Sequence, residues 1–212
     1  MAEEDRFLRD ATRGFVEGII MPMRREVDAD EREHKIIEPI MKELCVGFGT
    51  QRMLFPEKYG GLELHRFQEF YWAIEELARG DSGMTIAAID TNWALMPILY
   101  EPYRREDLIE EFARIFCGDE LHFACYALTE PQGGCDIENI DVMKGRTIKT
   151  TATLEGDEWV INGEKQWPTN SGISSLYLTA CTTDPDLGEE GIALIYVPAP
   201  TKGLDFSDFE VK

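Results

Sequence analysis

Histidine is scarce in this 212-residue sequence, and cysteine does not cluster. His34, His65 and His122 lie far apart, and none belongs to a Cys/His group. Because a metal site needs several such ligands close together, the sequence predicts none. The cysteines form no C-x-x-C pair and are odd in number, which is typical of free or structural thiols in a reducing cytosol. The five are Cys45, Cys117, Cys125, Cys135 and Cys181.

Basic residues and long apolar runs are also scarce. Lys and Arg number 21 against 41 Asp and Glu, which gives a formal net charge of −20. This charge argues against binding to nucleic acid or to an anionic membrane surface. No apolar run reaches the ~18 residues of a spanning helix, and the acidic start lacks the regions of a signal peptide. We therefore expect a cytoplasmic protein with no nucleic-acid or membrane partner.

The first half of the sequence has apolar residues at helical spacing, in an otherwise ordinary globular composition. Asp81-Ser82 offers an N-cap for one helix, which should end before Pro97, and another helix should stop at Gly118. The apolar stripes are Phe7, Ala11, Phe15 and Ile19; Phe67, Phe70, Tyr71, Ile74, Leu77 and Ala78; and Leu108, Ile109, Phe112, Ile115 and Phe116.

From about residue 121 the pattern alternates with period two, which is typical of strands. The alternation covers residues 147–154, and Gly156-Asp157 then turns the chain into residues 159–161. Residues 176–183 and 192–197 are predicted as further strands, the latter central because both of its faces are apolar. Helices followed by strands predict an α+β fold in two packed units.

The first candidate site is the segment Tyr126-Ala-Leu-Thr-Glu-Pro-Gln-Gly-Gly-Cys-Asp136. A strand ends at Thr129-Glu130-Pro131, and a Gly-Gly loop follows. Backbone amides in such a loop can bind the oxygens of a planar heterocycle or a pyrophosphate without net positive charge. A plain strand that ends in a Pro/Gly turn explains the segment equally well.

The second candidate site is Asn162-Gly-Glu-Lys-Gln-Trp-Pro-Thr-Asn-Ser-Gly172. The indole of Trp167 could cover an apolar ring system, and the hydroxyl of Thr169 could donate to a ring nitrogen. The alternative is a buried tryptophan at a β-corner. Neither segment decides between its two interpretations alone.

Together the two segments resemble the acyl-CoA dehydrogenase family, which has Tyr-x-Leu-Thr-Glu-Pro-x-x-Gly-Ser-Asp and then Asn-Gly-x-Lys-x-Trp-Ile-Thr-Asn. The resemblance extends to Leu-Phe-Pro-Glu-Lys-Tyr-Gly-Gly at 54–61, Ile-Glu-Glu-Leu-Ala-Arg-Gly-Asp-Ser at 74–82 and Pro-Thr-Lys-Gly-Leu at 200–204. It implies an N-terminal α-helical domain at 1–121. It also implies a middle, antiparallel β-barrel-like or sandwich domain at 122–212 that binds FAD.

The resemblance also implies roles for single residues. The end of the first strand and the Thr129 hydroxyl would hold the pyrimidine side of the flavin, Trp167 would flank it, and Thr169 would lie near N5. The Gly-Gly-Cys loop would face the pyrophosphate of FAD or CoA. The implied cofactor-binding residues are Tyr126, Ala127, Leu128, Thr129, Gly134, Cys135, Trp167, Pro168 and Thr169, and the implied substrate-binding residues are Glu130 and Cys135.

This sequence departs from the family pattern at three places. Cys135 replaces the usual Ser and is a weaker hydrogen-bond donor. Pro168 replaces Ile or a similar residue and has no N–H for a ligand. Residues 137–147 form a longer segment than in typical members, which would reshape the rim of the acyl pocket.

The resemblance implies FAD-dependent α,β-dehydrogenation of an acyl-CoA thioester in fatty acid or organic acid metabolism. No catalytic residue is expected in this chain. The glutamate that removes the α-proton is expected from a C-terminal helical bundle, in a longer chain, a homo-oligomer or a second subunit. An electron-transfer flavoprotein or a similar carrier is the expected acceptor. The alternatives are an oxygen-reacting oxidase or monooxygenase on the same scaffold, and a non-catalytic binding subunit.

Overall fold

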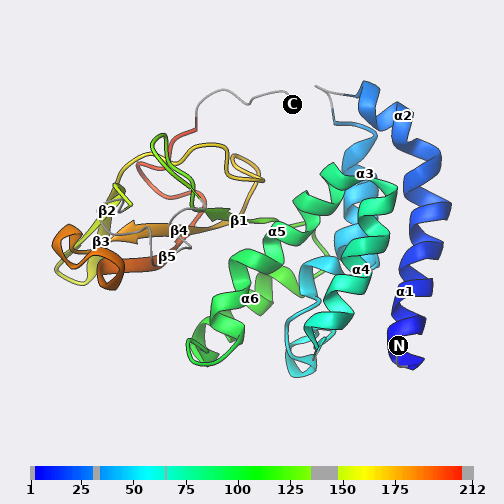
Figure 1. Cartoon of the computed structure of the whole chain (residues 1–212), viewed down its shortest axis with the longest axis horizontal. Coiled ribbons are helices and arrows are strands. Elements are labelled where there is room, and N and C mark those ends of the chain that lie inside the picture. The colour runs from blue at the N-terminus through cyan, green and yellow to red at the C-terminus, as the bar shows by residue number, and fades with distance from the viewer. Residues whose placement is uncertain (1–2, 31–33, 65, 135–147, 207–212) are drawn as a thin grey trace. The chain divides into compact units, whose positions relative to one another are not determined.

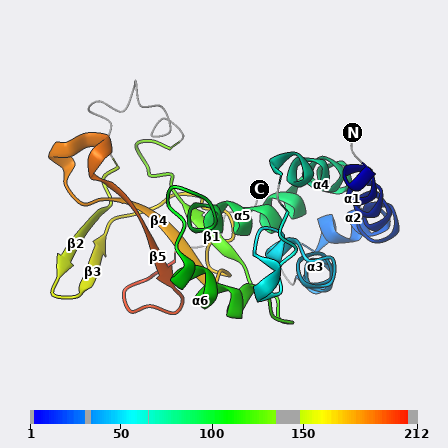
Figure 2. The same cartoon turned by 90° about the horizontal axis from the view of Figure 1, so that it is seen from below.

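The computed structural model describes residues 3–30, 34–64, 66–134 and 148–206. These residues divide into two compact units, one within Met1–Phe123 and one formed by Ala124–Phe206. Figures 1 and 2 show that the first unit is helical and that the second contains the strands. The prediction of an α+β fold with helices first and strands second is confirmed.

The first unit is built from six α-helices joined by short π- and 3-10-helical turns within its described residues. In Figure 1, α1 runs beside α4, with which it packs. No helix in the described part of the chain is both long and apolar enough to cross a membrane. The helices are α1 (Glu3–Phe15), α2 (Met21–Ala29), α3 (Ile37–Lys42), α4 (Phe67–Gly80), α5 (Ser82–Leu99) and α6 (Glu106–Phe116).

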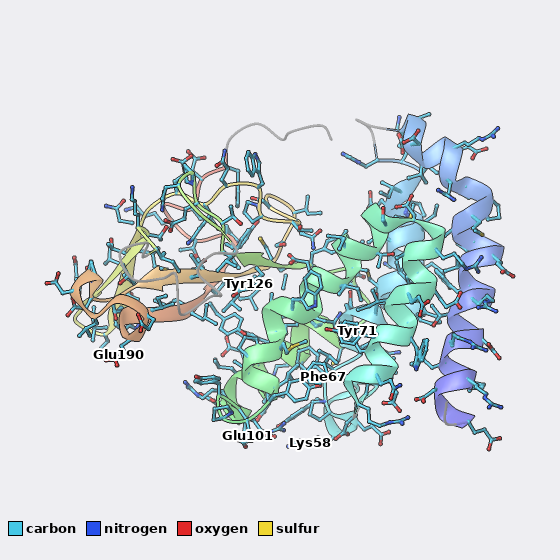
Figure 3. The ribbon with its side chains drawn as sticks, viewed as in Figure 1. Lys58, Phe67, Tyr71, Glu101, Tyr126 and Glu190 are labelled. Carbon is cyan, nitrogen blue, oxygen red and sulfur yellow. The ribbon has the colours of Figure 1, made fainter. Side chains whose placement is uncertain are left out.

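The buried face of α1 differs from the predicted stripe. The helix is present, but Phe7 is 78% exposed and Ala11 is exposed, whereas Val16 and Ile20 in the following π-helical turn are fully buried. The buried face therefore lies one residue beyond the predicted stripe. A four-residue spacing drifts around a helix that turns every 3.6 residues, so spacing alone did not fix the face. On α4, Phe67 and Tyr71 are likewise exposed (Figure 3), while Phe70 and Leu77 are buried.

A buried carboxylate joins α1 to α4. Glu76 accepts hydrogen bonds from the guanidinium groups of Arg13 on α1 and Arg79 on α4, and its side chain is almost fully buried. The hydrogen bond from Arg13 is the largest cause that lowers the pKa of Glu76, against a smaller rise from burial. The carboxylate is therefore ionised where it is buried, between two cations.

Helix α5 begins as predicted and ends later than predicted. The Asp81 side chain accepts from the Met84 amide at 2.9 Å, the geometry of an N-cap. The expected end before Pro97 is wrong, because α5 continues through Pro97 to Leu99. Proline so close to a helix C-terminus removes only one intrahelical hydrogen bond, and Ile98 and Leu99 are buried in the core. Helix α6 ends at Phe116, just before the predicted stop at Gly118.

Removal of the cap should weaken the first unit. We expect Asp81→Ala to lower the free energy of unfolding by about 1 kcal/mol, because the Met84 amide loses its acceptor. Urea denaturation measured by circular dichroism checks this. Glu75→Ala, an exposed acidic residue on α4, serves as the control for loss of one negative charge. Equal midpoints for the two variants would contradict the capping role.

The second unit contains a five-stranded mixed sheet. Strand β4 pairs in parallel with β1 and antiparallel with β5; β2 pairs in parallel with β4 and antiparallel with β3. The predicted antiparallel arrangement is therefore wrong. Alternation identifies strands but not their directions, and the long connection from β1 to β4 permits a parallel crossover. The strands are β1 (Ala124–Ala127), β2 (Thr151–Glu155), β3 (Glu158–Asn162), β4 (Leu176–Thr182) and β5 (Ile192–Pro198).

The central strand of the described sheet is β4. All of its residues are buried, and it pairs with β1, β2 and β5. The prediction that β5 is central is wrong, since its pairing among the described strands is with β4 alone. The apolar residues of β5 are partly buried, apart from Leu194 and Pro198, which are exposed. A strand can therefore be apolar on both faces and still lie beside the centre.

The β2–β3 hairpin follows the predicted turn. Glu155 pairs with Glu158 across Gly156-Asp157, and Gly156 has φ +66. Glycine at the first central position of a two-residue loop is typical of a type II′ hairpin. Figure 2 shows β2 and β3 side by side.

The expectation of free thiols holds for the four cysteines in the described residues, Cys45, Cys117, Cys125 and Cys181, while Cys135 lies outside them.

Candidate functional site

The two candidate segments meet in the second unit. The backbone amide of Gln166 donates to the Thr129 carbonyl at 2.8 Å. The Lys165 ammonium donates to the Leu128 carbonyl at 3.1 Å and to Glu130 Oε1 at 2.8 Å. Three successive residues of the first segment are thus bonded to two successive residues of the second. The structure brings together segments that are more than thirty residues apart in the sequence.

Glu130 lies at the centre of these contacts and is only 5% exposed. Its Oε1 accepts from Lys165 and, at 2.9 Å, from the Thr150 amide. Its Oε2 accepts from the Lys149 amide at 2.7 Å and from the Gln132 side chain. A carboxylate has about four lone-pair positions, so these donors use its hydrogen-bonding capacity. The side chain predicted to bind substrate is engaged within the chain.

The charge on Glu130 is strongly favoured. Burial alone raises the pKa of Glu130, but hydrogen bonds from Lys165 and from the amides of Lys149 and Thr150 outweigh it and lower the pKa to about 2. Burial lowers the pKa of Lys165, and the Glu130 carboxylate opposes that fall. Both side chains are at most 9% exposed. They form a buried ion pair, called the Glu130–Lys165 pair below.

This pKa predicts a loss of stability in acid. A depressed carboxylate pKa contributes stability above the unfolded pKa of 4.5, and this contribution falls as the pH approaches about 2. The contribution at neutral pH is on the order of 3 kcal/mol. We expect the difference in unfolding free energy between the wild type and Glu130→Gln to shrink from pH 7 to pH 3. Urea titrations at several pH values check this.

Glu164→Gln, at an exposed neighbouring position, is the matched control and should show no such convergence with the wild type. A difference between wild type and Glu130→Gln that is the same at pH 3 and pH 7 would contradict the assigned pKa.

The Gly-Gly loop of the first segment begins with a tight turn. The Glu130 amide donates to the Gly133 carbonyl at 2.7 Å, and the Gly133 amide donates back to the Glu130 carbonyl at 3.1 Å. The Gly133 amide is therefore used within the turn. A Cβ on Gly134 would lie 3.0 Å from Thr129 Oγ1, so the glycine lets the loop pass close to the threonine hydroxyl.

Trp167 has an unusual conformation for a bulky residue. Its φ is +56, in the left-handed region, and its side chain is 57% exposed. The interpretation as a buried tryptophan at a β-corner is wrong. A left-handed conformation costs about 1–2 kcal/mol for a non-glycine residue, and a following proline disfavours helical backbone further. Such strain, in a residue that exposes an aromatic face, is typical of ligand-binding loops.

The rest of the second segment is anchored to the sheet. The Asn170 side chain donates to the Ala124 carbonyl at 3.3 Å, and the Gly172 amide donates to the Tyr177 hydroxyl at 2.8 Å. Asn170 is also left-handed, with φ +62. Pro168 and Thr169 are half-buried. The loop 167–169 is thus held on one side by the Gln166 amide on the Thr129 carbonyl and on the other by Asn170, with Trp167 exposed between these two anchors.

The remaining predicted residues of the first segment lie on or just after β1. Tyr126, labelled in Figure 3, is in register with Leu178 on β4, which is in register with Tyr196 on β5. Ala127 is buried, and Leu128 and Thr129 are half-buried. The carbonyls of Leu128 and Thr129 each accept one bond from the second segment, which leaves one lone pair on each oxygen.

Two sequence predictions fall outside the described residues. They are the role of Cys135 and the effect of residues 137–147. Conversely, sequence reasoning overlooked Lys165 and Gln166, which join the segments. An isolated Lys two residues before a Trp gives no pairing signal. Glu130 itself gave a hint, since it is an acidic residue directly after an apolar strand. A carboxylate buried there needs a cation or backbone amides as hydrogen-bond donors.

The chain is thus an α+β protein with a helical unit followed by a mixed-sheet unit. Its candidate site consists of two loops joined by hydrogen bonds, one of which carries the strained Trp167. The chain belongs to the acyl-CoA dehydrogenase family. The family model for the acyl-CoA dehydrogenase N-terminal domain matches residues 2–101, and that for the acyl-CoA dehydrogenase middle domain matches residues 125–212.

Among similar proteins, cyclohexane-1-carbonyl-CoA dehydrogenase of Syntrophus aciditrophicus is 31% identical over 204 residues, covering 96% of this chain and 49% of the relative. Butyryl-CoA dehydrogenase of Megasphaera elsdenii has a similar structure, with TM-score 0.77, 25% identity and 96% and 50% coverage. The prolyl acyl carrier protein oxidase AnaB gives TM-score 0.78, 28% identity and 98% and 51% coverage. The chain spans about half the length of the curated relatives it matches.

Proposed function

We propose that this chain binds FAD through the two joined segments and takes part in the α,β-dehydrogenation of an acyl-CoA thioester. In this proposal residues 1–121 are the N-terminal domain and residues 122–212 the middle domain. The observation that carries it is the direct bonding of residues 128–130 to Lys165 and Gln166. In this proposal the bonding holds Thr129 and the Trp167 loop together as one site.

The half-buried and exposed groups of this site fit a flavin ring. The exposed indole of Trp167 offers an aromatic face. The hydroxyls of Thr129 and Thr169 offer donors for ring oxygens and nitrogens. Tyr126, Ala127, Leu128, Gly134, Cys135 and Pro168 complete the proposed cofactor contacts. The flavin supplies hydride-accepting chemistry, and a fixed donor such as Thr169 stabilises negative charge on the ring.

We further propose that the α-proton is removed by a carboxylate outside these 212 residues. Among the described residues of the two segments, the buried acidic group is Glu130, and four donors surround it. With a pKa of about 2 it is a poor base at neutral pH. The base would come from the remaining part of a longer chain or from a partner subunit. An electron-transfer flavoprotein or a similar carrier would accept the electrons.

The activity of the pure chain tests this division of roles. We expect the 212-residue chain with FAD to give little or no turnover of butyryl-CoA or longer acyl-CoA substrates with an artificial electron acceptor. FAD absorbance reports binding in the same sample. Full dehydrogenase turnover by the chain alone would contradict an external base. A chain that binds no FAD would contradict the cofactor role instead.

A second candidate reaction is oxidation with oxygen as the acceptor, favoured by the likeness to an acyl carrier protein oxidase. Photoreduction of the FAD complex followed by stopped-flow mixing with air separates the two. Reoxidation over minutes supports the dehydrogenase, and reoxidation within a second supports the oxidase or a monooxygenase. A chain that is colourless after unbound FAD has been removed would favour a non-catalytic binding subunit.

A further inference from the structure

Burial of the Glu130–Lys165 pair costs free energy. Removing two charges from water costs several kcal/mol per ion, and replacement of buried pairs by apolar residues is often neutral or stabilising. Both side chains are at most 9% exposed, with Nζ and Oε1 2.8 Å apart. Among the described residues, the thiol of Cys181 is the other titratable group that interacts with the pair. Stability alone is therefore a weak reason for the pair.

The contacts of the pair show what it holds in place. Lys165 spans from the Leu128 carbonyl to Glu130, on either side of Thr129. Glu130 in turn fixes the amides of Lys149 and Thr150, which lead into β2. The next residue after Lys165 bonds the Thr129 carbonyl. The pair thus clamps three stretches of backbone that come from distant parts of the sequence.

The clamp lies next to the proposed flavin contacts without being one of them. Thr129 adjoins Glu130, and Trp167 lies two residues after Lys165. The strained φ of Trp167 needs surroundings that hold it, because a strained backbone relaxes when its anchors are lost. Side chains that hold the segments on both sides of a binding site set the geometry of that site before the ligand binds.

We propose that Glu130 and Lys165 are positioning residues, which act by presetting the relation between Thr129 and the Trp167–Thr169 loop before FAD binds. This inference rests on the proposed function for its ligand. Its structural part, the fixed relation of the two loops, does not depend on the ligand. No carboxylate or ammonium of the pair touches the flavin or the substrate in this account.

The test uses Lys165→Met in the 212-residue chain, with Lys202→Met as matched control because Lys202 is exposed in the same unit. We expect hydrogen exchange of the Gln166 amide, measured by NMR without FAD, to accelerate by about tenfold in Lys165→Met. The control should exchange as the wild type does. We also expect FAD to bind about tenfold more weakly, with a shifted flavin absorption band.

A double variant, Glu130→Leu/Lys165→Met, keeps the test decisive if the single change unfolds the unit, since apolar replacement removes the unpaired charge. We expect it to fold, to exchange the Gln166 amide rapidly and to bind FAD weakly. Wild-type exchange at Gln166 in a folded variant overturns the inference, whatever FAD does. Unfolding of both variants also overturns it, because the fold as a whole then needs the pair. A wild type that fails to bind FAD refutes the proposed function, while the exchange result still decides the positioning role.

Discussion

Trp167→Ala should weaken FAD binding by about tenfold to a hundredfold, the effect with the clearest physical basis in this molecule. An aromatic face that stacks on a planar ring contributes about 1–3 kcal/mol. Trp167 exposes 57% of its side chain in a loop fixed at both ends. Fluorescence titration of FAD measures the affinity. Trp159→Ala is the matched control, because Trp159 is 47% exposed in the same unit but lies on the β2–β3 hairpin.

The backbone of Trp167 allows a second variant that separates strain from stacking. Glycine adopts a φ of +56 without penalty, and alanine does not. Trp167→Gly should therefore be more stable than Trp167→Ala by about 1 kcal/mol, while both bind FAD weakly. Thermal denaturation without FAD measures the first difference. Equal stability of the two variants would contradict the strained conformation, and unchanged affinity in both would remove Trp167 from the site.

Gly163→Ala should destabilise the second unit by about 3 kcal/mol. An added Cβ would lie 2.5 Å from Thr150 Oγ1 and 2.6 Å from Thr150 Cα. The second atom belongs to the backbone, so no change of side-chain rotamer relieves the clash. Thr150 also carries an amide that holds Glu130 at 2.9 Å. The clash therefore acts at the junction of the two segments, and urea denaturation measures its cost.

Two controls isolate this clash. Thr150→Ala in the Gly163→Ala background should restore little stability, because the Thr150 Cα stays in place. Gly14→Ala, on an exposed part of α1 with no atom near the new Cβ, should stabilise the first unit by about 1 kcal/mol. Full rescue by Thr150→Ala would show that the hydroxyl alone makes the contact and would contradict the backbone clash.

The sequence predicted the elements better than their arrangement. Local signals such as the Asp81 cap and the Gly156 turn act within a few residues, and both are present in the structure. The face of α1 and the position of β5 depend on partners distant in the sequence. Strand direction depends on how a connection crosses the sheet, which alternation does not encode.

The candidate site likewise has features that the sequence predicted and long-range contacts that it did not. The two segments and the fold class were recognisable from residue order, because the family pattern orders the same residues along the chain. The contacts that join the segments were not recognisable from the sequence, since Lys165 and Glu130 are 35 residues apart. Nor did the sequence show that Glu130 is enclosed by four donors or that Trp167 is left-handed. Long-range pairing and backbone strain appear only when the chain is folded.

The most direct test of the account is an FAD titration of the pure 212-residue chain, followed by absorbance and by quenching of flavin fluorescence. The account predicts a yellow complex with one FAD per chain, and affinity that falls in Trp167→Ala but not in Trp159→Ala. A chain that is colourless once unbound FAD has been removed by gel filtration, or that binds FAD equally well without the Trp167 indole, would contradict the central claim that the two joined segments form a flavin site.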